Sequence, residues 1–499
     1  MKISDTLKAT CTSATNAYLY NTTIQTNYGP VKGVPALNAT CCSYLADYES
    51  VTVWRSIPLA ADTGGANRWK PPQPRAPWNE TYVADSFGSA CPAGTAPYGG
   101  ADTVYDEDCL NLNIWTLANS TSEKRPVMIW SYPAGANNAW AMFDGGAMAL
   151  QDVVVVNYNY RTGPYGWLAL PELWEESGNV TTGNYGMLDQ VAALKWVHAN
   201  IADFGGDPDR ITTVGQSAGS AVVYHTVNSP LAKGLIVGAI AESGIQDPRD
   251  PASTSLAEGY NNMSTSIALS EKLMSLLNVT TLEEFRMNIS AETINEYSGF
   301  TGFSNWRGTL DGYALPMTYW EELQKGPAND VPLMTGNTKD ESGASYGTNV
   351  TVDKYQDSVK STYGDYAARF LEAYPASNST QASMNTNLMA RDASLVGSWN
   401  FGNHWSKTAS SPFYSYYWDH APPGQSQGAY HMSEITYMFN NLCGTNLPWT
   451  SVDYQVATTL NAYWANFIKT QNPQHWGELW ERHVTLWTEY FSSRTNATL

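Results

Sequence analysis

The stretch that most constrains this chain is residues 215–219, Gly-Gln-Ser-Ala-Gly, which sets a serine between two close glycines. Residues 211–214 (ITTV) are typical of a short buried strand, and residues 218–223 (AGSAVV) are typical of the first turns of a helix. Glycines let backbone segments approach closely, and a helix N-terminus directs amide donors toward negative charge that forms beside it. The pattern therefore predicts a sharp strand-to-helix turn that presents Ser217 as a nucleophile.

The segments around this turn carry a family resemblance. Residues 183–190 (GNYGMLDQ), 193–197 (ALKWV) and 204–208 (FGGDP), followed by the serine turn, resemble the type-B carboxylesterase/cholinesterase family almost position for position. Residues 107–113 (EDCLNLN) and 159–161 (NYR) resemble two further signatures of that family. The resemblance implies an enzyme that hydrolyses carboxylic esters through its serine.

The resemblance extends from about Tyr28 to Trp487 and is weakest near residues 245–310. It implies the α/β-hydrolase fold, with a large, mostly parallel central sheet flanked by helices, and with loop and helical insertions around an active-site gorge. The length of 499 residues would suggest about three domains. No Pro/Gly/Ser linker or charge run divides the chain, so we expect residues 1–499 to form one α/β-hydrolase domain.

A serine nucleophile needs a base, because an unassisted hydroxyl is too weak at neutral pH. In α/β-hydrolases the order along the chain is Ser, Asp/Glu, His, so the base should follow Ser217. Six histidines do so, and among them His431 lies in residues 428–435 (GAYHMSEI), which resemble the family segment with the catalytic histidine. We expect His431 to be the base, and His420 to be a polar residue at the end of a strand.

The acid that orients the histidine should lie between the other two residues. Residues 331–336 (VPLMTG) are typical of a strand, and they lead into residues 337–342 (NTKDES). That loop resembles the family segment in which a glutamate completes the triad, so Glu341 is preferred over Asp340. A buried carboxylate there would fix the tautomer of the imidazole and stabilise the imidazolium.

The segment expected to form the oxyanion hole departs from the family pattern. The family has three glycines after this strand, and here Pro133, Ala134 and Gly135 follow residues 127–132. Proline has no amide hydrogen, but by the resemblance the donors are the amides of Ala134, Gly135 and Ala218. Ala134 would be strained if its position required a positive φ. Ala136 replaces a usual aromatic residue, which should widen the pocket near the scissile carbonyl.

The cysteines and sequons suggest an extracellular protein. The resemblance implies a disulfide between Cys91 and Cys109, and an ion pair of Arg68 with Glu107 that braces the same loop; the pairing of Cys11, Cys41, Cys42 and Cys443 stays open. The first 23 residues lack the apolar segment of a signal peptide, so we interpret the chain as a mature form. Eleven Asn-X-Ser/Thr sites are candidates for N-glycosylation: Asn21, Asn38, Asn79, Asn119, Asn179, Asn262, Asn278, Asn288, Asn349, Asn378 and Asn496.

The composition limits the kinds of partner that the protein can bind. A formal charge of −19 argues against nucleic acid and anionic membranes, and no apolar stretch is long enough to span a bilayer. The sequence predicts no metal and no cofactor. The loop from Cys91 is glycine-rich without tryptophan, which disfavours a cholinesterase or an interfacial lipase. We expect a secreted esterase for small to medium or aromatic esters, and the alternatives are an acyltransferase or lactone-forming enzyme and a non-catalytic binding protein.

Overall fold

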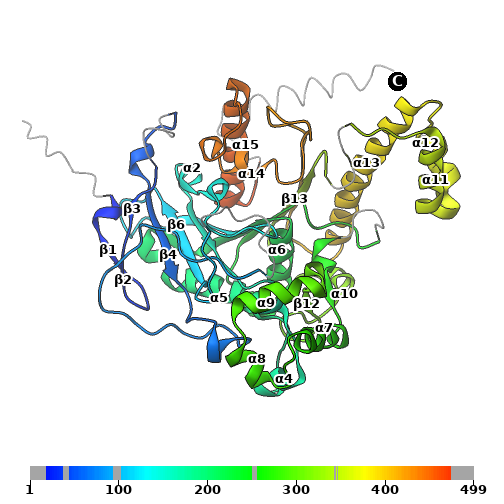
Figure 1. The fold of residues 1–499 in the computed structure, drawn as a ribbon. Coiled ribbons are helices and arrows are strands. Elements are labelled where there is room, and N and C mark those ends of the chain that lie inside the picture. Colours follow the sequence, from blue (N-terminus) through cyan, green and yellow to red (C-terminus); the bar gives the residue numbers. More distant parts are fainter. Residues whose placement is uncertain are drawn as a thin grey trace, which may run out of the picture.

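The computed structural model describes residues 18–37, 44–93, 103–249, 255–341, 344 and 347–473. Several residues of interest lie outside this part of the chain: Cys11, Asn38, Cys41, Cys42 and Asn496. Within the described residues, a nine-stranded sheet forms the centre of the molecule, in the order β14-β13-β10-β9-β7-β8-β6-β4-β3 (Figure 1). Its strands are β3 (Val34–Pro35), β4 (Thr52–Pro58), β6 (Asn111–Thr116), β7 (Arg125–Ser131), β8 (Val154–Tyr158), β9 (Gly206–Gln216), β10 (Gly238–Glu242), β13 (Leu333–Thr338) and β14 (Phe413–Trp418).

The sheet is parallel from β8 to β14 and antiparallel at the β3–β4–β6 edge and where β6 meets β8. Parallel strands are covered on both faces, so they read as continuous apolar runs. Val154, Val155 and Val156 of β8 follow this rule, with no exposed surface. The α/β-hydrolase fold expected from the resemblance is therefore present, with a mostly parallel sheet.

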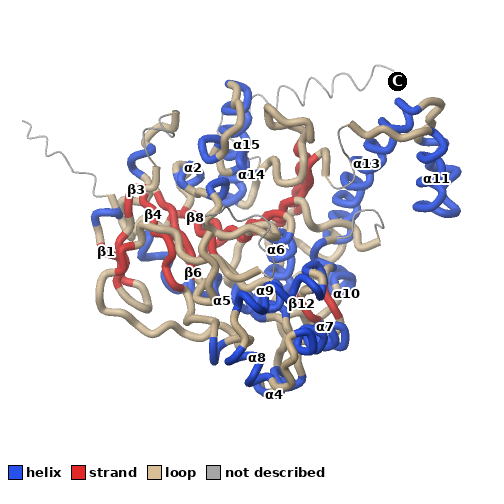
Figure 2. The backbone as a smooth tube through the Cα atoms, viewed as in Figure 1, coloured by secondary structure: helices blue, strands red, loops and turns tan. Residues whose placement is uncertain are grey.

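Helices cover the sheet on both sides. Figure 2 shows the strands as a layer with α2, α14 and α15 above it and α5 below it. The helices are α2 (Gly146–Ala149), α3 (Gly163–Trp167), α4 (Pro171–Glu176), α5 (Tyr185–Asn200), α6 (Ala218–Asn228), α7 (Met263–Leu276), α8 (Leu282–Asn288), α9 (Ala291–Ser298), α10 (Tyr319–Lys325), α11 (Val352–Tyr363), α12 (Ala367–Ala373), α13 (Ser379–Trp405), α14 (Ile435–Met438) and α15 (Ser451–Thr470). None of these is both long and apolar enough to cross a membrane.

Two small sheets accompany the central one. The first joins β1 (Thr23–Gln25), β2 (Pro30–Lys32) and β5 (Tyr82–Val83), and the second pairs β11 (Tyr260–Asn261) with β12 (Gly308–Thr309). In the second sheet, β12, which follows α9, lies beside β11, which precedes α7. Helices α4 and α7–α9 gather at the lower edge in Figure 1, whereas α11 and α12 project to the right.

Candidate active site

The serine turn is built as the sequence predicts, between β9 and α6. Ser217 has φ 56° and ψ −121°, a strained conformation for a residue with a side chain. The backbone holds it in place: the amide of Ser217 donates to the Glu242 carbonyl at 2.8 Å, and the Ser220 hydroxyl donates to the Ser217 carbonyl at 2.7 Å. The side chain is half-buried at the N-terminus of α6.

Both glycines of the turn are required by close backbone contacts. A Cβ on Gly215 would lie 2.4 Å from the Gly219 carbonyl oxygen, and a Cβ on Gly219 would lie 1.9 Å from the Ser131 carbonyl oxygen. Any side chain at either position would therefore push α6 away from the ends of β7 and β9. The glycines fix how deeply the helix N-terminus sits against the sheet.

Three parallel strands bring the candidate triad residues to one edge of the sheet. Ser217 follows β9, Glu341 comes just after β13, and His431 lies in the loop after β14. The carboxyl ends of parallel strands meet at the same edge, where ligands bind in open α/β sheets. His431 Nδ1 forms a short hydrogen bond with Glu341 Oε1, and Glu341 Oε2 accepts from the amide of Thr338 at 2.9 Å.

No hydrogen bond joins Ser217 to His431 among the described residues. The Gln216 side-chain amide also lies beside the imidazole, with its Nε2 3.4 Å from Nε2 and 3.5 Å from Nδ1 of the ring. Those distances are at the limit for a hydrogen bond. Catalytic hydrogen bonds are often long without substrate and tighten only in the reacting complex.

The two alternative residues are engaged elsewhere. Asp340 accepts from Arg391 Nε at 2.8 Å and from the Ala429 amide at 2.9 Å, and so anchors the loop that carries the histidine. His420 Nε2 lies 2.8 Å from Asp453 Oδ1. Burial alone would raise the pKa of Asp453. Hydrogen bonds from Thr450, His420 and Tyr437 outweigh this effect and lower the pKa to about 2. Both residues thus have structural partners away from Ser217.

The electrostatic surroundings of His431 combine burial with nearby carboxylates. Burial alone would lower the pKa of His431, but the hydrogen bond and charge of Glu341, with the charge of Glu434, raise it above its ordinary value. Its side chain is 34 % exposed, whereas that of Glu341 is only 7 % exposed. The buried carboxylate therefore stabilises the imidazolium form.

The sequence analysis did not predict two buried acids beside the candidate triad. Glu242 ends β10, and Glu434 follows His431 by three residues; neither has any exposed surface. Burial raises the pKa of Glu242 to about 8, against the hydrogen bond from Trp464 Nε1 at 2.7 Å. Burial, followed by the charges of Glu242 and Glu341, also raises the pKa of Glu434 well above its ordinary range. Glu242 could have been found as a polar residue at the end of a strand that neighbours the serine strand.

The expected oxyanion segment places its positive φ on the retained glycine. Gly135 has φ 78°, and Ala134 is not among the described residues with positive φ, so the replacement of glycine by alanine carries no such strain. The Ala136 amide donates to the Pro133 carbonyl at 3.3 Å, which closes a turn. Ala134, Gly135 and Ala218 line one common cavity of about 190 Å³.

The widening expected from Ala136 stays a prediction. Ala136 does not line the 190 Å³ cavity; it borders a separate space of about 20 Å³ together with Ala90 and Tyr105.

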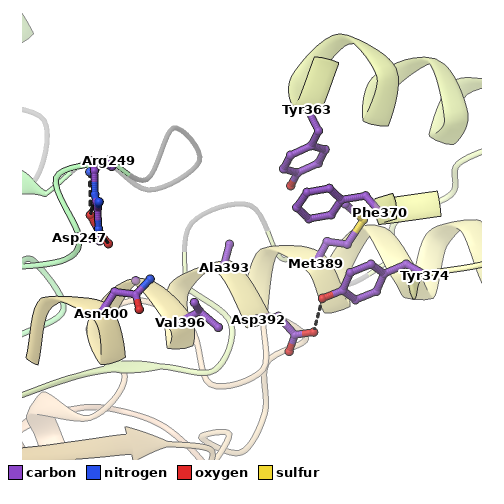
Figure 3. A pocket seen from close by; sticks show the side chains of 11 residues that line it. Asp247, Arg249, Tyr363, Phe370, Tyr374, Met389, Asp392, Ala393, Val396 and Asn400 are labelled. Carbon is purple, nitrogen blue, oxygen red and sulfur yellow. Dashed lines mark hydrogen bonds and ion pairs between the residues drawn. The ribbon is translucent and has the colours of Figure 1, made fainter. Parts of the chain in front are cut away.

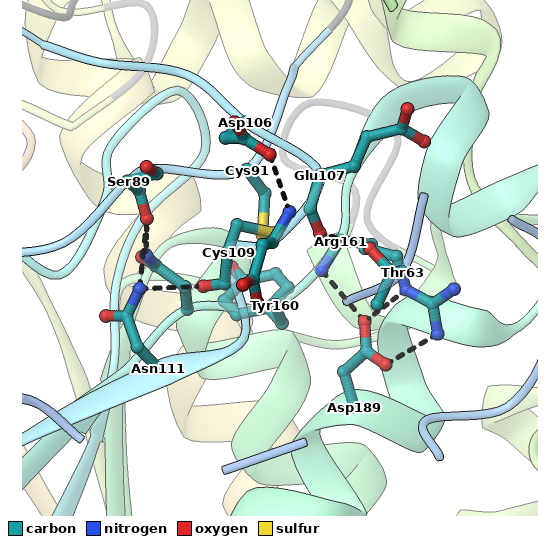
Figure 4. The surroundings of a disulfide bond; sticks show 12 residues. Thr63, Ser89, Cys91, Asp106, Glu107, Cys109, Asn111, Tyr160, Arg161 and Asp189 are labelled. Atoms are coloured by element: carbon teal, nitrogen blue, oxygen red, sulfur yellow. Dashed lines mark hydrogen bonds and ion pairs between the residues drawn. A yellow bond between two sulfur atoms is a disulfide. The ribbon is translucent and has the colours of Figure 1, made fainter. Parts of the chain in front are cut away.

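The predicted disulfide joins Cys91 to Cys109 (Figure 4). The predicted ion pair of Arg68 with Glu107 is also present, with Arg68 Nε 2.7 Å from Glu107 Oε1. Figure 4 shows a second, buried pair below the disulfide, in which Asp189 accepts from Arg161 Nε at 2.8 Å and Nη2 at 2.7 Å. These contacts tie together segments that are far apart in sequence.

A second cavity, of about 630 Å³, lies apart from the candidate triad (Figure 3). Tyr363, Phe370 and Met389 cluster at one end of it, and Asp247 and Arg249 lie at the other. None of the candidate catalytic residues lines this space. Within the described residues, no group of three or more His, Cys, Asp or Glu side chains could hold a metal ion.

The fold and the serine turn define an α/β-hydrolase, and comparison with known proteins gives the family. The sequence pattern of the carboxylesterase family matches residues 20–499. The chain belongs to the carboxylesterase family and is a serine hydrolase of carboxylic esters.

Similar proteins with established names are esterases. The chain is 32 % identical to the fumonisin B1 esterase of Sphingopyxis macrogoltabida, over 84 % of this chain and 78 % of that one. It is 29 % identical to the para-nitrobenzyl esterase of Bacillus subtilis (strain 168), over 90 % of both chains. A solved structure of a PNB esterase superimposes with a TM-score of 0.71 at 26 % identity and covers 91 % of each chain.

Proposed function

We propose that the protein is a secreted carboxylesterase in which Ser217, His431 and Glu341 form the catalytic triad. The observation that carries the proposal is the bond between His431 Nδ1 and Glu341, at the same sheet edge as the strained Ser217 turn. This arrangement supplies a nucleophile, a base and a buried orienting acid. We also propose that residues 1–499 form one domain, since the central sheet takes strands from β3 to β14.

The reaction follows from these roles. Ser217 Oγ attacks the ester carbonyl carbon while its proton passes to His431 Nε2, and the amides of Ala134, Gly135 and Ala218 donate to the oxyanion. As the intermediate collapses, His431 returns the proton to the alcohol, which leaves. Water then attacks the acyl-enzyme with His431 again as base, and this step releases the carboxylic acid and restores the Ser217 hydroxyl.

The test is substitution of the nucleophile. Ser217→Ala should lower kcat for 4-nitrophenyl esters by several orders of magnitude, because only oxyanion and binding contributions remain. The thermal unfolding temperature should not fall, because alanine at this positive φ has the same backbone strain as serine. Retention of activity by this variant would exclude Ser217 as the nucleophile.

Secretion and N-glycosylation are supported by exposure and by the disulfide. Nine of the eleven sequon asparagines lie in the described residues, and every one of the nine is exposed. A disulfide also persists best in an oxidising compartment. We expect the protein expressed in a eukaryotic secretory host to lose mass on treatment with an N-glycanase; no change in mass would refute glycosylation.

The alternatives are not favoured. A binding protein has no need of the strain at Ser217 or of the buried Glu341–His431 pair. An acyltransferase would have to exclude water from the acyl-enzyme, and the His431 side chain is about one-third exposed. Small to medium esters, including aromatic ones, suit a cavity of about 190 Å³ lined by Trp167 and Trp306.

A further inference from the structure

The 190 Å³ cavity adjoins the expected oxyanion donors. It begins at Ala134, Gly135 and Ala218, whose amides would hold the oxyanion, and extends along α6 past Val222. His431 does not line it. Since His431 must give its proton to the departing alcohol, the alcohol lies beside His431 and the acyl chain points away from it, into this cavity.

The cavity has one charged residue in its lining, and it is a cation. Arg307 is an exposed residue that lines the cavity, in the segment that leads into β12, and no Asp or Glu lines the space. Arg307 donates from Nε to the Ser304 carbonyl at 2.7 Å, and no carboxylate of the described residues forms an ion pair with it.

Two further polar side chains face the same space. Gln190 is 7 % exposed and lines the cavity, yet its amide forms no hydrogen bond with the described residues. His225 also lines it, and its Nδ1 is buried without a partner. Burial lowers the pKa of His225 to about 4, so its ring is neutral near pH 7. A buried polar atom without a partner, such as His225 Nδ1, is costly unless a ligand satisfies it.

We propose, on the basis of the proposed esterase function, that the preferred substrates are monoesters of short dicarboxylic acids. The free carboxylate of the acyl chain pairs with Arg307, whose planar guanidinium matches a carboxylate in geometry. Gln190 and neutral His225 donate N–H groups to its oxygens, while Trp167 and Trp306 enclose the methylene groups. At about 30 Å³ for each water-sized group, the cavity takes an acyl chain of roughly five carbons, as in a glutarate.

The experiment compares monoethyl glutarate with ethyl pentanoate, which has the same acyl length and no second carboxylate, by release of ethanol. The quantity is the ratio of kcat/KM for the first ester to that for the second. Arg307→Met should lower this ratio about tenfold, chiefly through KM for the glutarate, and Arg307→Lys should restore part of it. Arg369→Met changes the net charge equally at an exposed site outside the described cavities, and should leave the ratio unchanged.

A second variant tests the buried donor. Gln190→Met keeps the size of the side chain, and should also lower the ratio through loss of N–H groups from the carboxylate. Equal effects of Arg307→Met on both esters, or a preference of the unaltered protein for ethyl pentanoate that Arg307→Met does not change, would overturn the inference while the esterase function stood. Failure of the unaltered protein to hydrolyse any ester would instead overturn the proposed function itself, and this inference with it.

Discussion

The close contact at Gly219 yields a quantitative prediction for Gly219→Ala. The new Cβ would lie 1.9 Å from the Ser131 carbonyl oxygen and 2.7 Å from its carbon, both of them backbone atoms that cannot rotate away. The N-terminus of α6 must therefore move by about 1.1 Å to bring the contact from 1.9 Å to 3.0 Å. That movement displaces Ser217 and the Ala218 amide relative to Ala134 and Gly135.

A misplacement of about 1 Å can cost roughly 100-fold in rate, and overpacking of this kind costs about 1–3 kcal/mol of unfolding free energy. We expect kcat for 4-nitrophenyl butyrate to fall about 100-fold or more and the thermal unfolding temperature to drop. Gly238→Ala is the control, because its closest contact is 3.3 Å to a side-chain atom of Phe467. Activity and unfolding temperature of Gly219→Ala equal to those of Gly238→Ala would refute the reasoning.

Three further predictions concern Glu341, Glu242 and the disulfide. Glu341→Gln should lower kcat by about 10⁴-fold, and should move the acid limb of kcat/KM to lower pH, because Glu341 raises the pKa of His431; an unshifted limb would contradict this. Glu242 keeps its proton in the folded state up to about pH 8 but releases it near its ordinary pKa when unfolded. Stability should therefore fall as pH rises from 5 to 8, and less so in Glu242→Gln, as thermal unfolding at each pH would reveal. The double variant Cys91→Ser, Cys109→Ser should lower the free energy of unfolding by roughly 3 kcal/mol, because the disulfide closes a short loop. An unchanged midpoint of denaturant unfolding would show that the bond adds no stability.

The sequence predicted the features that depend on local pattern. The serine turn could be predicted because both glycines meet backbone atoms at distances that no side chain allows. Glu341 was preferred over Asp340 because residues 337–342 resemble the family segment with the triad glutamate, and in the structure Asp340 accepts from Arg391 instead. The disulfide followed from the family signature.

What the sequence did not predict depends on distant packing. The charge of Glu242 acts on Glu434 because the end of β10 and the residue before α14 lie in the same buried region, and no spacing in the chain indicates this. That Tyr105 lines the same small space as Ala136 likewise depends on packing between separate segments. The proposed role of Arg307 likewise depends on distant packing, because Arg307 and residues of α6 line the same cavity although they lie far apart in sequence.

The most direct measurement of the central claim is a crystal structure after reaction with a phosphonate ester. The account predicts phosphorus bonded to Ser217 Oγ, one oxygen accepting from the amides of Ala134, Gly135 and Ala218, and His431 Nε2 within about 2.6–3.2 Å of Ser217 Oγ or the leaving-group oxygen. Labelling of another serine, or an adduct at Ser217 with His431 still out of reach, would contradict it.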